Sequence, residues 1–213
     1  ECKDLIFSDK YSISIINLNC KEFKIKANIL NLAKRFYMDS LIFDQNACTS
    51  PHLILWYGKQ NKNIYNIFWN ELKSNILQGK LFTANEKNSI DKYLKLCEIT
   101  AVRKEIQSYQ INESIFKMQL KKIPKDIHNF RVGYGFYFEY FFNDLKKLKK
   151  YLTPKIQTLT YAGFSSIELK NHLSKSKISN LNRVVPFGRS LEFNLIWDGY
   201  DLPRYFSKII DIN

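Results

Sequence analysis

Residues 44–51 read DQNACTSP and place one cysteine, Cys48, in a polar segment typical of a turn. The segment follows an amphipathic run and precedes the apolar run at residues 53–57. A cysteine kept only for packing more often lies within an apolar run, because it behaves as a small hydrophobe. A thiol flanked by amides and hydroxyls at a turn is accessible to a substrate. We therefore interpret Cys48 as a nucleophile that attacks an acyl carbon.

The 213-residue chain has a globular composition, with 45% hydrophobic and 15% aromatic residues. It is long enough to bury a substantial core, and it contains neither an internal repeat nor a low-complexity tract. The formal net charge of +13 favours polyanionic partners. The lysines are spread along the chain, however, and we interpret their densest cluster, at residues 146–150, as a solvated helix face.

The four cysteines are widely and irregularly spaced, which matches neither a zinc site nor a dense disulfide framework. This usage predicts a reducing, cytoplasmic environment, with Cys2, Cys20 and Cys97 as unreactive thiols. No pair of histidines has the spacing of metal ligands, so we expect no metal site. The chain begins at Glu1 and enters an apolar run almost at once. We interpret it as a piece of a longer polypeptide.

Apolar periodicity predicts alternating strands and helices, hence an α/β fold in one domain. The paired glycines of residues 133–135 lack the third glycine and the following helix of a dinucleotide-binding loop. Strands are expected at residues 5–7, 12–16, 53–57, 113–120, 136–142, 156–159 and 183–187, helices at 23–43, 64–77, 85–106, about 145–150 and 165–174, and either type at 202–210.

Three segments in the same order resemble the long-chain fatty acid reductases, the acyl-CoA reductases of bacterial luminescence. The first is DQNACTSP at residues 44–51, which resembles the nucleophile segment of that family. The second is QT at 157–158 followed by YAGF at 161–164. The third comprises NRVVPFGR at 182–189 and WDGYDL at 197–202. The resemblance extends from about residue 9 to the end of the chain.

This resemblance implies an aldehyde dehydrogenase-like catalytic domain, with a mostly parallel sheet flanked by helices. It implies that the cofactor-binding domain lies outside residues 1–213, and that NADPH reduces an acyl thioester to a fatty aldehyde through an acyl-cysteine at Cys48. Gln45 and Asn46 would orient the nucleophile segment, and Glu139 lies at a distance along the chain compatible with a glutamate that contacts the cofactor. Acyl-CoA or an acyl-protein, an acyl-transferase, an acyl-protein synthetase and further copies of the chain are the implied partners.

Departures from the wider aldehyde dehydrogenase pattern leave alternatives open. No glycine precedes Gln45, and Glu22 lies in the region of the glutamate base of oxidising members without matching its context. Aldehyde oxidation by the same fold, a basic nucleic-acid-binding module and a non-catalytic assembly domain remain alternatives. His52, four residues after Cys48, is expected to be a surface residue, although it is also a candidate base. Glu139 is expected by default to face solvent.

Overall fold

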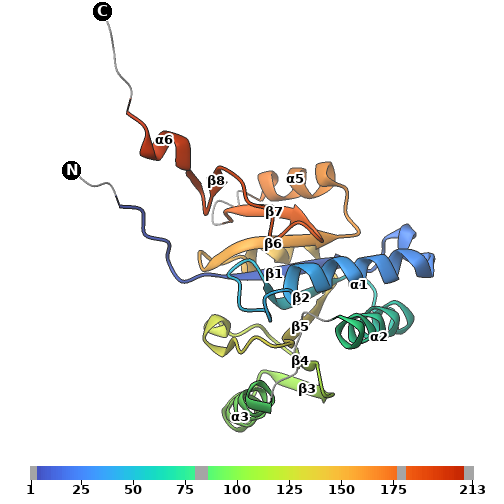
Figure 1. Ribbon diagram of the computed structural model, residues 1–213. Coiled ribbons are helices and arrows are strands. Elements are labelled where there is room, and N and C mark those ends of the chain that lie inside the picture. The colour runs from blue at the N-terminus through green and yellow to red at the C-terminus, as the bar shows by residue number, and fades with distance from the viewer. Residues whose placement is uncertain (1–3, 80–85, 177–180, 209–213) are drawn as a thin grey trace, which may run out of the picture.

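A seven-stranded sheet forms the centre of the structure, a computed structural model that describes residues 4–79, 86–176 and 181–208. Neighbouring strands run parallel, except that β3 and β4 form an antiparallel pair at one edge (Figure 1). The predicted mostly parallel α/β sheet is therefore confirmed. In spatial order the strands are β3 (Ile106–Ile111), β4 (Phe116–Leu120), β5 (Phe136–Phe142), β2 (Pro51–Tyr57), β1 (Tyr11–Asn17), β6 (Ile156–Ala162) and β7 (Arg183–Pro186).

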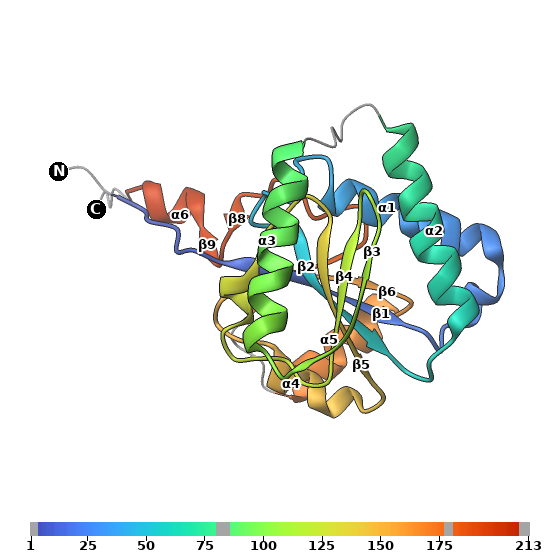
Figure 2. The ribbon, with the colours of Figure 1, turned by 90° about the horizontal axis from the view of Figure 1, so that it is seen from below.

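Helices cover both faces of this sheet and enclose a separate apolar core on each side. On one face, α1 (Lys26–Ser40) and α2 (Lys62–Gln78) pack beside each other and contribute most of the helical residues of that core. On the other face, α3 (Glu86–Val102), α4 (Leu148–Tyr151) and α5 (Ser166–Lys175) close the second core. Figure 2 shows α2 and α3 over different parts of the sheet.

The central strand β2 shows how the sequence supports two cores. Leu53 and Leu55 belong to the core under α3, whereas Ile54 and Trp56 belong to the core under α1 and α2. Successive side chains of a strand point to opposite faces, so a strand buried on both faces is apolar at successive positions. Parallel strands need such covering, because their crossover helices lie on the faces of the sheet.

Local capping residues set where several helices begin. The Asn61 side chain accepts hydrogen bonds from the backbone N–H groups of Asn63 and Ile64 and so caps α2. Ser165 caps α5 in the same way, as the pair of serines in the sequence indicates. Asp144 caps a short 3-10 helix, η3 (Leu145–Lys147), which leads into α4. The predicted lysine-rich helix is therefore present, but it is short and divided.

Most of the predicted elements are confirmed, with bounds that differ by a few residues. The segment at residues 23–43 is shorter than predicted: it comprises a 3-10 helix, η1 (Lys21–Lys24), then α1, then turns from Leu41 onward. The predicted strand at residues 113–120 begins only at Phe116. Strands or helices observed where they were predicted are β1, β2, β5, β6, β7, α2 and α5.

Three predictions of secondary structure were wrong or incomplete. Residues 5–7 form no strand, and Ile6 is 85% exposed, because no neighbouring strand pairs with them. The helix predicted to reach residue 106 ends at Val102, and the sequence pattern missed β3 altogether. β3 is an edge strand that is mostly exposed, so its polar sequence carries no burial signal. Residues 80–85 and 209–210 lie outside the described residues.

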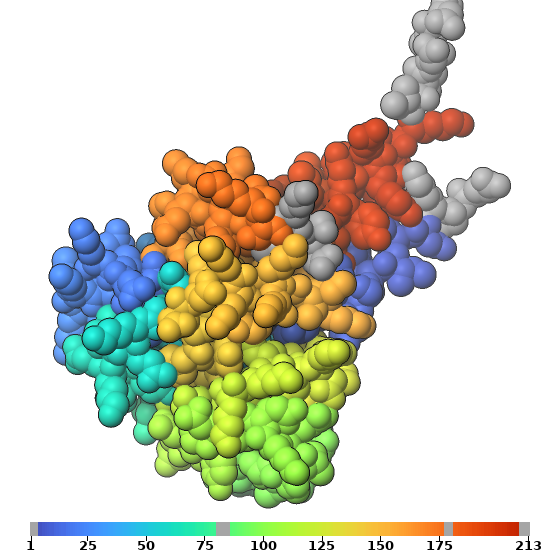
Figure 3. Space-filling model, turned by 180° about the vertical axis from the view of Figure 1, so that it is seen from behind, coloured from blue at the N-terminus to red at the C-terminus, as the bar shows by residue number. Residues whose placement is uncertain are grey.

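Both ends of the described chain run together along one side of the molecule. Residues 4–9 lie beside the C-terminal segment, which contains β8 (Ile196–Trp197), β9 (Tyr200–Asp201) and α6 (Leu202–Phe206). Figure 3 shows this segment projecting away from the body of the molecule. An ion pair of 2.8 Å between Lys10 and Asp198 fixes its base. The helix or strand predicted at residues 202–210 is a short helix, α6, in the described part of that segment.

Candidate functional site

Cys48 lies in the connection between α1 and β2, at the edge of the sheet where β2 begins. A backbone hydrogen bond of 2.9 Å from the Ser50 N–H to the Ala47 carbonyl closes a turn with Cys48 and Thr49 at its corner. The cysteine is exposed and forms no disulfide. The predicted polar turn with an accessible thiol is therefore present. We call residues 44–50 the nucleophile turn.

Gln45 anchors the nucleophile turn to the start of β5. Its side chain is fully buried, and its amide donates hydrogen bonds to the carbonyls of Pro51 and Phe136, at 2.9 and 3.1 Å. The amide oxygen accepts from the backbone N–H groups of Gly135 and Phe136, at 3.0 and 3.1 Å. Both donors and both acceptor positions of the amide are thus occupied. The side chain therefore ties the turn to β2 and β5, and the role of Gln45 in orienting the nucleophile stays a prediction.

Residues 133–135 form the other wall of the nucleophile turn. The Tyr134 N–H donates to the Asp44 carbonyl at 2.7 Å, and a Cβ on Gly133 would lie 3.0 Å from the Asn46 side-chain oxygen. Gly135 has φ +83°, and a Cβ there would lie 2.5 Å from the Ser114 carbonyl oxygen. Gly133 therefore permits close packing against the turn, and Gly135 permits close packing against the Ser114 carbonyl. Asn46 itself is exposed, adjacent to this contact.

Ser12 also contacts the nucleophile turn, although it was not among the predicted site residues. Its hydroxyl donates a hydrogen bond of 2.8 Å to the carbonyl oxygen of Cys48 and accepts one of 3.2 Å from the N–H of Thr158. Ser12 is fully buried at the start of β1, and Thr158 is in β6. The alternation of serine and isoleucine in residues 12–15 predicts a half-buried strand with its serines toward solvent, so it carried no signal that Ser12 is buried.

His52 is buried, with 7% of its surface exposed, so the expectation of a surface histidine was wrong. It lies in β2, which is covered by helices on both faces, so its side chain is buried together with those of the apolar residues that follow it. Burial, followed by the positive charge of Arg131, lowers the pKa of His52 to about 3. The imidazole is therefore neutral at pH 7. Its participation in chemistry stays a prediction.

Glu139 is also buried, with 1% of its surface exposed, so the default expectation that it faces solvent was wrong. One carboxylate oxygen accepts from the indole N–H groups of Trp56 and Trp69, at 2.7 and 3.1 Å. The other accepts from the Tyr65 hydroxyl at 2.8 Å, and Lys117 donates to that hydroxyl at 3.1 Å. Burial raises the pKa of Glu139. Its two oxygens have partners beneath α2, and a contact with a cofactor stays a prediction.

The remaining candidate groups lie elsewhere. Among the described residues, Cys97 is exposed and Cys20 is half-buried, and both are free thiols; Cys2 lies outside the described residues. His128 stacks on Tyr11, with ring centroids 6.3 Å apart.

Within the described ranges, no group of three or more His, Cys, Asp or Glu side chains is arranged to hold a metal ion. In the same residues, no helix is long and apolar enough to cross a bilayer.

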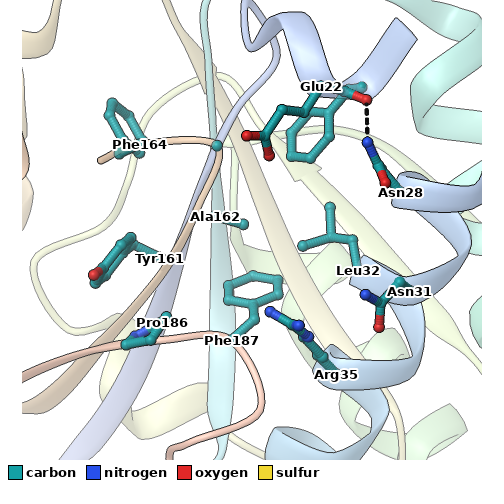
Figure 4. Close-up of a pocket in the computed structure, with 12 residues that line it drawn as sticks. Glu22, Asn28, Asn31, Leu32, Arg35, Tyr161, Ala162, Phe164, Pro186 and Phe187 are labelled. Atoms are coloured by element: carbon teal, nitrogen blue, oxygen red, sulfur yellow. Dashed lines mark hydrogen bonds between the residues drawn. The ribbon is translucent and has the colours of Figure 1, made fainter. Parts of the chain in front are cut away.

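A hollow of about 280 Å³ lies between α1 and the ends of β6 and β7. Figure 4 shows Glu22, Asn28 and Arg35 at its rim and Phe187 at its base. Because the strands are parallel, the ends of β6 and β7 lie at the edge of the sheet opposite to the start of β2. No residue of the nucleophile turn lines this hollow, so it is not a route to Cys48.

Aromatic residues make up 15% of the sequence, and the alternatives for their rings are the lining of an apolar acyl tunnel and, for most of them, ordinary core packing. The structure places many of their rings in the two cores, where Phe68 contacts both Phe36 and Trp56 at centroid distances of 5.4 Å. Rings in van der Waals contact leave no channel between them. These core rings therefore stabilise the fold beneath the site.

Comparison with solved structures places this arrangement in a known fold. A Δ-pyrroline-5-carboxylate dehydrogenase from Mycobacterium tuberculosis matches with a TM-score of 0.56 at 6% identity, over 84% of this chain and 35% of its own. Lactaldehyde dehydrogenase gives 0.54 at 11%, over 86% and 40%. The substrate-bound AldH of Staphylococcus aureus gives 0.55 at 9%, over 83% and 39%.

Sequence comparison does not assign the chain to a family. No family model matches the chain, and no curated protein matches it. At the identities of the solved structures, the likeness shows the fold alone, and the chain spans well under half of the length of each. The mostly parallel sheet, its flanking helices and these neighbours together show that the chain has the fold of part of an aldehyde dehydrogenase.

Proposed function

We propose that this chain is the thiol-bearing part of an NADPH-dependent reductase that converts a long-chain acyl thioester, such as an acyl-CoA, into a fatty aldehyde. The overall reaction consumes the acyl thioester, NADPH and a proton, and it releases the aldehyde, the carrier thiol and NADP⁺. The observation that carries the proposal is the exposed Cys48 at the corner of a turn that Gln45 fastens to the sheet. The aldehyde dehydrogenase-like fold and the three resembling segments support it.

In this proposal, the sulfur of Cys48 attacks the carbonyl carbon of the thioester as a thiolate. A tetrahedral oxyanion forms, the bond to the carrier sulfur breaks, and the carrier leaves as a thiolate that takes up a proton. One thioester has replaced another, so this step is nearly balanced in free energy. The hydrogen bonds of Gln45 keep the turn in the geometry that the attack requires, and the neighbouring Asn46 is assigned the same role by the resemblance.

The reduction needs a hydride, which NADPH supplies when it is bound. Glu139 is the residue predicted to contact that cofactor, and its carboxylate oxygens already accept from Trp56, Trp69 and Tyr65. We therefore assign cofactor binding to a domain outside residues 1–213 and derive no hydride step from this chain. Homo-oligomers, an acyl-transferase and an acyl-protein synthetase belong to the same proposal as partners.

The test is acyl transfer to the thiol without cofactor. The chain is incubated with radiolabelled palmitoyl-CoA, and the modified residue is located by peptide mass spectrometry. We expect label on Cys48, loss of label in Cys48→Ser, and unchanged labelling in Cys97→Ser, which removes another exposed free thiol. Label distributed equally between Cys48 and Cys97, or retained in Cys48→Ser, would refute the proposal.

Oxidation of an aldehyde by the same fold is the second candidate function. It is favoured by the names of the neighbouring structures, which include an indole-3-acetaldehyde dehydrogenase in complex with NAD⁺. The two functions differ in the fate of the acyl-cysteine, since an oxidising enzyme hydrolyses it with activated water. An acyl-Cys48 that persists for hours in buffer favours the reductase. One that hydrolyses within minutes favours the oxidising alternative.

A further inference from the structure

The peptide bond that follows Cys48 is held by a buried hydroxyl from another strand. The Ser12 hydroxyl accepts a hydrogen bond from the Thr158 N–H, at 3.2 Å, so its own proton is directed to the Cys48 carbonyl oxygen, 2.8 Å away. Ser12 is fully buried, and its neighbours leave the hydroxyl one arrangement of donor and acceptor. The Cys48 carbonyl is thereby turned toward the interior of the sheet.

The backbone around Ser12 is irregular on both sides. The register of β1 against β2 shifts between Ser12 and Ile13, and its register against β6 shifts between Tyr11 and Ile13. Such irregularities re-aim a side chain and are frequent beside active sites. Here the shift brings the Ser12 hydroxyl to the nucleophile turn. Ser14, two residues along, bonds the Thr160 hydroxyl within the sheet at 2.6 Å.

Fixing this carbonyl also fixes the N–H of Thr49, which lies in the same peptide; the N–H of Cys48 lies in the preceding peptide, whose Ala47 carbonyl accepts from the Ser50 N–H. The peptide is trans, so the N–H of Thr49 points away from Ser12 when the Cys48 carbonyl points toward it. Among the hydrogen bonds between described residues, none uses the N–H of Cys48 or of Thr49 as a donor. Two such N–H groups next to an exposed sulfur are what an oxyanion requires.

We propose that Ser12 is a positioning residue that holds the Cys48–Thr49 peptide so that the N–H of Thr49, beside the N–H of Cys48, can stabilise the oxyanion of acyl transfer. The inference rests on the proposed function, because it assumes attack by Cys48 on an acyl carbon. Without the Ser12 hydroxyl, the buried carbonyl loses its donor and the peptide can rotate. The Thr49 N–H then loses its alignment, while the sulfur remains exposed.

Two reactions of the same thiol separate this role from a purely structural one. Acylation by p-nitrophenyl butyrate passes through a tetrahedral oxyanion, whereas alkylation by iodoacetamide displaces iodide without one. In Ser12→Ala we expect acylation of Cys48 to slow about tenfold or more, with alkylation changed less than about twofold. Ser14→Ala is the matched control, because Ser14 is equally buried on the same strand and does not contact the turn. Both of its rates should stay near those of the unsubstituted chain.

Ser12→Thr, which retains the hydroxyl, should restore acylation, and thermal unfolding confirms that each variant is folded. If Ser12→Ala does not fold, Ser12→Val, which lacks the hydroxyl, is compared with Ser12→Thr, which has nearly the same shape and retains it. Acylation at the unsubstituted rate in Ser12→Ala, an equal fall in both reactions, or no acylation of the unsubstituted chain by the ester would overturn the inference. An unsubstituted chain that reacts with the ester and not with palmitoyl-CoA contradicts the proposed substrate and leaves the Ser12 inference supported.

Discussion

Replacing Gln45 with alanine tests whether one side chain determines the geometry of the nucleophile turn. Gln45 makes four hydrogen bonds to backbone groups and is fully buried. A net contribution of about 1 kcal/mol for each bond gives about 4 kcal/mol. The Phe136 N–H keeps a second acceptor, the Gly133 carbonyl at 3.0 Å, and water can enter the vacated space. We therefore expect a loss of about 3 kcal/mol in the free energy of unfolding.

Urea unfolding followed by far-ultraviolet circular dichroism measures this loss. Gln157→Ala is the control, because Gln157 is also buried but its side-chain oxygen has no hydrogen-bond partner among the described residues. It should cost clearly less than Gln45→Ala. Acylation of Cys48 should fall in the Gln45 variant even under conditions where it remains folded. A Gln45→Ala chain that loses less than about 1 kcal/mol, or that costs no more than Gln157→Ala, would refute the reasoning.

Three further predictions concern residues around the site. Gly135→Ala should lower the free energy of unfolding by about 2 kcal/mol or more, because its φ is +83° and the new methyl would lie 2.5 Å from the Ser114 carbonyl oxygen. An unchanged thermal midpoint would contradict this prediction. Glu139→Gln places an amide N–H₂ among the donors of Trp56 and Trp69, so we expect the free energy of unfolding to fall by about 2 kcal/mol and the tryptophan emission to shift. An unaltered emission spectrum would argue against this arrangement. The pKa of His52 is lowered to about 3 in the folded state, against about 6.5 unfolded, so its contribution is full above pH 6.5 and declines by up to about 1.4 kcal/mol per pH unit as pH falls toward 3. His52→Gln should lose less stability than the unsubstituted chain between pH 6.5 and 4.5, and equal losses in urea unfolding would refute the assignment.

The nucleophile segment was predictable because its signal is local. A cysteine among turn-forming residues, between an amphipathic and an apolar run, indicates an accessible thiol, and the structure shows Cys48 exposed. Gln45 is predicted to orient the same turn; the structure shows its side chain bonded to backbone groups of β5, and the orienting role stays a prediction. Its actual partners at the start of β5 lie about ninety residues away along the chain. No local pattern indicates them.

The residues whose surroundings were misjudged are polar residues within strands. His52 and Glu139 were expected at the surface because isolated polar side chains usually face water. Both lie in central strands covered by helices on each face, which only the assembled sheet determines. Ser12 was overlooked for the same reason, since it contacts Cys48 across 36 positions of sequence.

Local sequence patterns suffice to predict that the chain alternates strands and helices around a buried sheet, and that one cysteine lies in a polar turn between two of them. Apolar periodicity and turn chemistry act over a few residues, so they can be read from the chain alone. The order of the strands and the burial of Glu139 and His52 follow only from the assembled fold. The same is true of the contacts that Ser12 and Gly135 make with Cys48 and Gln45 of the nucleophile turn. These depend on contacts between distant segments, whose free energies arise only when the whole sheet has formed.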